Sequence, residues 1–110
     1  MVDFTLEQVK AIHIEATSAA QAAAQRFRDQ HGEFGCCGFA WVNVPVKAST
    51  RLGRALKEVG FRRSYSGGMD LWNPGGTPTQ SMDIREHAAV AYASRLVQYG
   101  IDAYMCSRMD

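Results

Sequence analysis

The chain has 110 residues, of which 46% are hydrophobic and 21% are charged, and its formal net charge is +1 at pH 7. This composition excludes a disordered protein, a collagen-like chain and a small disulfide-stapled scaffold. The length is close to the most common domain size, so we expect residues 1–110 to form a single domain. No apolar run approaches the ~20 residues that span a bilayer, and the first residues do not read as a secretory signal. We therefore expect no membrane association and a cytoplasmic location.

Residues 4–30 show the pattern of one amphipathic helix. Thr5 and Gln8 have the spacing of a capping box, and Gly32 is a stop signal. Apolar or small residues recur every three or four positions and form an alanine-rich seam: Leu6, Val9, His13, Ala16, Ala20, Ala23 and Phe27. Small side chains permit close packing against the chain's own sheet or against a second copy. A homodimer is the oligomeric state that we expect.

Residues 36–46 form a nearly continuous apolar run, which predicts a central strand covered on both faces and ended by Pro45. Ser49 or Thr50 then caps a short helix. Its expected buried stripe is Leu52, Ala55, Leu56 and Val59. Strands over residues 61–65 and 69–72 follow, joined by a glycine-rich hairpin.

Residues 73–78 predict a loop, and Ser81 is the expected cap of the final helix. The apolar face of that helix is expected to comprise Ile84, Ala88, Tyr92, Leu96 and Tyr99. Gly100 ends the helix, and the last strand is predicted over residues 101–106. The order is therefore a helix followed by β-α-β-β-α-β. It predicts an α+β fold in which an N-terminal helix precedes a ferredoxin-like two-layer sandwich over residues 36–106.

The cysteines and histidines do not have the spacing of metal ligands. Cys36, Cys37 and Cys106 are interpreted as small buried side chains in a reducing compartment, with a redox pair as the alternative. His13, on the alanine seam, is expected to be packed and hydrogen-bonded, and His87 to form a local surface pair with Asp83. We expect neither a metal nor a cofactor.

Positive charge is concentrated in the middle of the chain. Lys47, Arg51, Arg54, Lys57, Arg62 and Arg63 are opposed there only by Glu58. The segment carries a net +5, against −4 for the rest of the chain. Such a segment beside a helix N-terminus suits phosphate binding, and a solvated helix face is the alternative interpretation. The overall charge is too low for a strong binder of duplex nucleic acid.

No nucleotide-hydrolysis or catalytic motif is present, so we expect no enzymatic activity and assign no catalytic residues. Exposed aromatic residues on a ferredoxin-like sheet can stack nucleic-acid bases, although the RNP1 pattern of RNA-recognition modules is absent here. Trp41 is expected in the core, and Trp72, at a strand end, is the expected contact residue. Arg108 and Asp110 lie at the C-terminus, where they can clamp a ligand or pair locally.

Several segments are similar to a family of small tailed-bacteriophage proteins. They are Cys37–Val44, Gly67-Gly68 with Leu71-Trp72, Gln80-Ser81, Gly100–Tyr104 and Ser107–Asp110. The resemblance covers residues 36–110 and implies a phage product that acts in the host cytoplasm, and it assigns no catalytic residues. Cys36 departs from the family pattern.

Two functional hypotheses follow. In the first, the protein is a phage accessory (host-takeover or anti-defence) factor that binds a nucleotide or another anionic, phosphate-bearing small molecule. Its candidate ligand-binding residues are Lys47, Arg51, Arg54, Trp72, Arg108 and Asp110. In the second, it inhibits a host protein by docking through the N-terminal helix or the sheet face.

Overall fold

The computed structural model describes residues 3–33 and 35–110. In chain order the elements are α1 (Leu6–His31), β1 (Gly38–Val44), α2 (Arg51–Glu58), β2 (Arg62–Arg63), β3 (Met69–Trp72), the 3-10 turn η1 (Pro74–Gly76), α3 (Met82–Gln98) and β4 (Tyr104–Met109). The strands form one sheet in the order β2-β3-β1-β4, and every neighbouring pair is antiparallel. The fold is therefore mixed α+β, with an N-terminal helix before a four-stranded antiparallel sheet.

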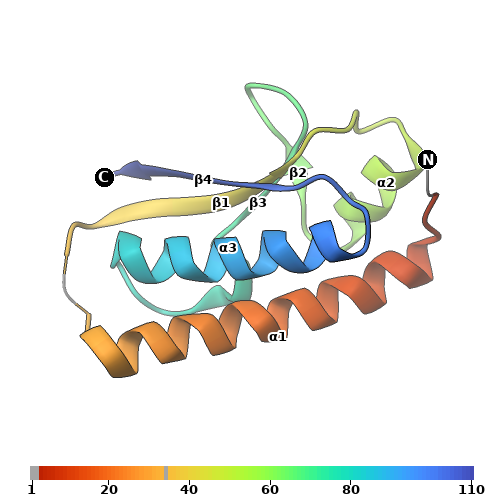
Figure 1. Cartoon of the computed structure of the whole chain (residues 1–110). Helices are drawn as coiled ribbons and strands as arrows, with labels where there is room; N and C mark the ends of the chain where they lie inside the picture. The colour runs from red at the N-terminus through yellow and green to blue at the C-terminus, as the bar shows by residue number, and fades with distance from the viewer. Residues whose placement is uncertain (1–2, 34) are drawn as a thin grey trace.

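The main helices are stacked on one side of the sheet. Figure 1 shows α3 lying below the sheet and α1 lying below α3. Ala55 and Leu56 of α2 belong to the same buried core as the apolar residues of α1 and α3. Within the described residues, no helix covers the opposite side of the sheet, which is thus left open.

The predicted start of α1 is confirmed. The backbone N–H of Gln8 donates to Thr5 Oγ1 at 3.1 Å, and the N–H of Thr5 donates to Gln8 Oε1 at 2.8 Å. These reciprocal bonds satisfy two backbone donors that a helix terminus otherwise leaves without partners. Thr50 and Ser81 likewise cap α2 and α3, as their sequence positions predict.

The alanine seam of α1 packs inside the chain. Ala16, Ala20 and Ala24 are almost completely buried, and α1 lies along α3, which presents Ala88 and Ala89. Small side chains on both helices allow their backbones to approach closely. These buried alanines of α1 therefore pack within the chain, so that part of the seam is not an exposed surface for a second copy or a host protein.

The prediction that β1 is covered on both faces is also wrong. Burial alternates along the strand: Ala40 and Val42 are buried, whereas Phe39 and Trp41 are only half-buried. Successive strand side chains point to opposite faces, and the helices cover only one of those faces. Trp41, expected in the core, therefore lies on the open side of the sheet. The apolar run misled the prediction because two of its outward residues, Phe39 and Trp41, are aromatic rather than polar.

The last strand is displaced towards the C-terminus relative to its prediction. It pairs with β1 from Tyr104, opposite Asn43, to Met109, opposite Gly38. Ile101 and Ala103, which were expected in the strand, are buried before it begins. Arg108 is consequently a strand residue, not part of a terminal tail.

Two smaller differences concern the ends of elements. β2 comprises only Arg62–Arg63 rather than residues 61–65. Tyr99, expected on the buried face of α3, is exposed, and its hydroxyl hydrogen-bonds to Glu15 of α1. This hydrogen bond, followed by burial, raises the pKa of Tyr99. An exposed tyrosine at the end of α3 thus fastens that helix to α1 from outside the core.

Candidate functional site

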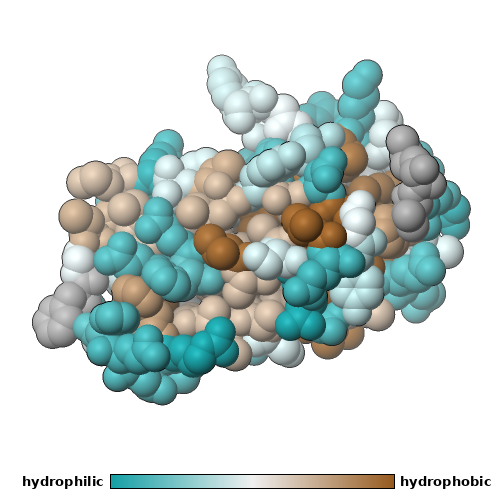
Figure 2. All heavy atoms as spheres, viewed as in Figure 1, coloured by the Kyte–Doolittle hydropathy of each residue, from teal (hydrophilic) through white to brown (hydrophobic). Residues whose placement is uncertain are grey.

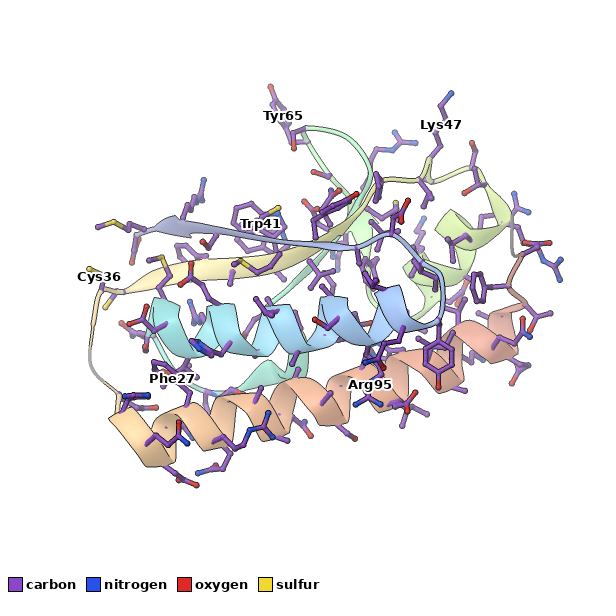
Figure 3. All side chains as sticks on the ribbon, in the orientation of Figure 1. Phe27, Cys36, Trp41, Lys47, Tyr65 and Arg95 are labelled. Atoms are coloured by element: carbon purple, nitrogen blue, oxygen red, sulfur yellow. The ribbon has the colours of Figure 1, made fainter. Side chains whose placement is uncertain are left out.

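The open face of the sheet carries an unusual set of side chains. The strand register brings Trp41 opposite both Trp72 and Cys106, and brings Phe39 opposite Arg108. Directly opposed residues in an antiparallel pair project from the same face of the sheet. We define the open face by the residues that this register places on it: Phe39, Trp41, Asn43, Asp70, Trp72, Tyr104, Cys106 and Arg108. Figure 3 shows Trp41 on the side of the sheet away from α3.

Three of these residues form an aromatic cluster. The rings of Trp41 and Trp72 are stacked, with centroids 4.3 Å apart and planes 18° from parallel. Phe39 meets Trp72 edge to face at 6.1 Å. Trp72 is 46% exposed although it takes part in this stack. The cluster is thus a preformed aromatic surface that remains accessible to solvent.

A cation accompanies the aromatic cluster. The guanidinium carbon of Arg108 lies 5.7 Å from the ring centroid of Phe39 and 6.0 Å from that of Trp72. Arg108 is exposed and forms no ion pair with any described residue. Arg85 of α3 approaches Phe39 to 5.5 Å, while its Nη1 donates to the Gly38 carbonyl at 2.6 Å. Arg108 is therefore a cation beside the aromatic cluster that is free to meet an anion.

The other end of the open face is closed by polar contacts. Asn43 Nδ2 donates to Asp70 Oδ1 at 2.8 Å and to the carbonyl of Gly67 at 3.0 Å. These bonds tie the β2–β3 hairpin to β1, where the positive φ of Gly67 and Gly68 permits the turn. Asp70 is only 7% exposed. Its carboxylate is therefore shielded from a ligand that approaches the aromatic cluster.

The thiol on the open face is not activated. Burial, and then the negative charge of Asp70, raise the pKa of Cys106. A raised pKa keeps the thiol protonated at neutral pH, and the thiolate is the nucleophilic form. Cys106 therefore contributes surface beside Trp41 rather than a reactive group.

The six candidate residues from the sequence do not form one site. Trp72 and Arg108 lie together on the open face, and Asp110 follows them with its N–H bonded to the Cys37 carbonyl at 3.1 Å. Lys47 points to the same side of the sheet as Trp41 in Figure 3, beyond the end of β1.

Two of the six belong elsewhere. Arg51 pairs with Asp3 at 2.6 Å, and Arg54 Nη1 donates to the carbonyl of Ser49 at 2.6 Å, both at the start of α2. Phe39 and Trp41 were missed as site residues. Their alternate positions on one strand were the signal that could have identified them.

The remaining cysteines are placed differently from their prediction. Cys36 and Cys37 are exposed rather than buried, and Cys37 Sγ lies 3.8 Å from Gln80 Oε1. They precede β1, and the carbonyl of Cys36 accepts from the N–H of Met82, the first residue of α3, at 3.0 Å. Among the described residues, no group of three or more His, Cys, Asp and Glu side chains is placed to hold a metal ion.

His13 and His87 lie on the helix side of the molecule. His13 is packed and hydrogen-bonded as predicted, with Nδ1 2.7 Å from the hydroxyl oxygen of Tyr92. Burial lowers the pKa of His13 and raises that of Tyr92. His87 Nδ1 donates to the backbone carbonyl of Asp83 at 2.9 Å, and its ring lies against that of Phe27, with centroids 4.2 Å apart and planes tilted by 35°. The expected pair thus uses the backbone of Asp83 rather than its carboxylate.

The surface on the helix side of the molecule is a weaker candidate for a binding site than the open face. Figure 2 shows the side of the molecule over α3 and α1, where strongly hydrophobic areas are small and separated by hydrophilic ones. None of the helices in the described ranges is long and apolar enough to cross a membrane. The chain matches no protein-family model, no curated protein and no solved structure, so its function must be inferred from the site itself.

Proposed function

We propose that the open face binds a nucleotide, with the base on the aromatic cluster and a phosphate beside Arg108. The observation that supports this proposal is the stacked, solvent-accessible pair Trp41–Trp72 with an unpaired guanidinium 6.0 Å from one of its rings. Flat aromatic surfaces stack bases, and arginine recognises phosphate through paired N–H donors. A planar ring carrying an anionic group is the ligand that matches both features.

We also infer that residues 36–106 adopt the ferredoxin-like arrangement. Support comes from the two successive units β1-α2-β2 and β3-α3-β4, which contribute β1 and β3 as the inner strands of the sheet. Sheet-type RNA-recognition modules stack bases on aromatic residues of their sheet face. Phe39 and Trp41 on β1 and Trp72 on β3 occupy a comparable face here. The fold and the ligand are thus consistent with one another.

We infer a binding role rather than a catalytic one. The open face presents rings, a guanidinium and a thiol whose pKa is raised by burial and by Asp70, and the Asp70 carboxylate already accepts a hydrogen bond from Asn43. The resemblance of residues 36–110 implies a phage product that acts in the host cytoplasm, and the accessory role that we propose for it is to hold a nucleotide there rather than to convert it.

Tryptophan fluorescence tests the proposal directly, because both tryptophans of the chain lie in the stack. Titration with AMP, GMP, CMP and UMP is expected to quench the emission of the wild-type protein. Trp72→Ala should weaken binding by about 1–3 kcal/mol, roughly 5- to 150-fold, measured by calorimetry. Trp72→Phe should retain part of the affinity because a ring remains.

The matched control is Tyr65→Ala, which removes an exposed aromatic residue at the hairpin tip, away from the stack. It should leave nucleotide affinity within twofold of wild type. No quenching and no heat with any of the four nucleotides at millimolar concentration would refute the proposal. Capture of a host protein by wild type but not by Trp72→Ala would then favour the inhibitor hypothesis on the same face.

A further inference from the structure

A second cationic feature lies at the edge of the sheet, separate from Arg108. A groove of about 470 Å³ opens between the end of α2 and strand β2. The residues that line it are Ala48, Lys57, Gly60, Phe61, Arg62, Arg63 and Met69. Three of these carry a positive charge and none carries a negative one. The groove is therefore a concave site whose charges all favour an anion.

The three cations of the groove are not held in ion pairs with other described residues. Lys57, Arg62 and Arg63 are exposed, and none forms an ion pair or a side-chain hydrogen bond with another described residue. By contrast, Arg51 in the same basic segment is paired with Asp3. Like charges that line one concavity repel each other, and a bound anion offsets that repulsion. The groove is thus the part of the basic segment best suited to hold phosphate.

The edge strand β2 connects this groove to the open face. In the register of β2 and β3, Arg62 lies opposite Asp70, so its side chain projects from the open face. Arg63 lies opposite Met69, so its side chain projects from the helix side. Strand residues rise about 3.4 Å each and strands lie about 4.8 Å apart, so the Cα atoms of Arg62 and Trp72 are roughly 8 Å apart. A nucleic-acid backbone that leaves the aromatic cluster therefore reaches the groove within a few nucleotides.

We propose that the groove binds a backbone phosphate of a single-stranded oligonucleotide whose base stacks on the aromatic cluster. The inference rests on the proposed function and specifies its ligand: a single strand of several nucleotides rather than a free mononucleotide. A single strand suits the two sites because its bases are unstacked and its backbone is flexible. The net charge of only +1 agrees with a local track of cations rather than a duplex-binding surface.

The test compares a labelled hexanucleotide with UMP. Fluorescence anisotropy with oligo(U) and oligo(dT) gives the affinity of the wild-type protein at several salt concentrations, and the two oligomers distinguish RNA from DNA. The groove variant is Lys57→Ala/Arg63→Ala. Its matched control, Lys10→Ala/Arg26→Ala, removes two exposed cations from α1. Circular dichroism verifies that each variant is folded, and Arg63→Gln is a milder second variant.

We expect the hexanucleotide to bind wild type about tenfold more tightly than UMP, because a second contact is added within one ligand. The groove variant should lose that advantage while binding UMP as wild type does. The slope of log Kd against log salt should fall by about 0.7 for each phosphate contact removed. The control should leave both the affinity and the slope unchanged.

Two other outcomes separate the proposals. If UMP binds but the hexanucleotide binds no more tightly, or the groove variant matches its control, the groove inference is overturned and the proposed function stands. If neither UMP nor the hexanucleotide binds to wild type, both are overturned. Tight binding of a duplex competitor in place of the single strand would also contradict the groove inference.

Discussion

One face of the sheet packs into the core that stabilises the fold, and the other is the surface that we propose for binding. On β1, Ala40, Val42 and Val44 face the helices and are at most 1% exposed, while Phe39 and Trp41 on the other side remain accessible. Both sets are apolar, so hydrophobicity alone does not distinguish them. The difference lies in what covers them: one face meets a packed helical layer, and the other meets only its own aromatic neighbours. An apolar residue of β1 is therefore a core residue only on the side that the helices cover.

The largest expected effect contrasts one residue from each side. Ile84 of α3 is completely buried on the helix side, and Ile84→Ala should lower the free energy of unfolding by about 2–5 kcal/mol. Trp72→Ala should lower it by only about 1 kcal/mol, since that ring is already partly exposed and mainly loses its stacking partner. Urea unfolding followed by circular dichroism measures both. Equal losses would show that the open face is part of the folding core.

A second substitution probes the packing of the helical layer. Ala20 of α1 is fully buried, and a Cβ placed on Gly75 of η1 would lie 3.1 Å from its Cβ. Ala20→Leu has no room to expand and should destabilise the fold by about 1–3 kcal/mol. The exposed Ala22→Leu, on the same helix, should change stability by at most about 0.5 kcal/mol. A neutral Ala20→Leu would mean that α1 packs less tightly than the structure shows.

A smaller effect is expected on the open face itself. The stacked rings of Trp41 and Trp72 should show a coupling energy of about 0.5–1.5 kcal/mol in a double-mutant cycle of unfolding free energies. The cycle uses Trp41→Ala, Trp72→Ala and the double variant. Coupling near zero would indicate that the two rings do not stack in solution. The aromatic cluster would then be flexible rather than preformed for a ligand.

Local signals in the sequence predicted the helices better than the strands. Each helix start is capped by contacts within a few residues, made by Thr5 with Gln8, by Thr50 and by Ser81. All the residues that define a helix start are therefore close together in the sequence. β4 was misplaced because its position depends on β1, which lies more than sixty residues earlier. Apolar character continues through Ile101 and Ala103, so composition does not show where pairing begins.

The candidate site was only partly predictable for a related reason. Trp72 was chosen because it lies at a predicted strand end and Arg108 because it lies at the C-terminus, and the structure brings them together. Phe39 and Trp41 were hidden within an apolar run whose covered and open sides alternate. Which side is open depends on where α1 and α3 pack. That information is tertiary and does not appear in the local pattern.

The smallest expected effect comes from a titration on the covered side. Burial lowers the pKa of His13 below its ordinary value of 6.5, so the unfolded chain takes up a proton at a higher pH than the folded protein does. The contribution of His13 to the free energy of unfolding is thus fully present above pH 6.5, and it is lost as the pH falls below that value. The free energy of unfolding should decrease between pH 7.5 and pH 5, and His13→Gln should make that decrease shallower.

The comparison isolates His13 because His31 and His87 are present in both proteins. Its hydrogen-bond partner Tyr92 does not titrate in this range, since burial raises its pKa. Parallel pH curves for wild type and His13→Gln would show that His13 is protonated as easily in the folded protein as in the unfolded chain. The ligand-binding affinity of the open face should be the same in both proteins at neutral pH, because His13 belongs to α1 and contacts Tyr92 of α3, on the other side of the sheet.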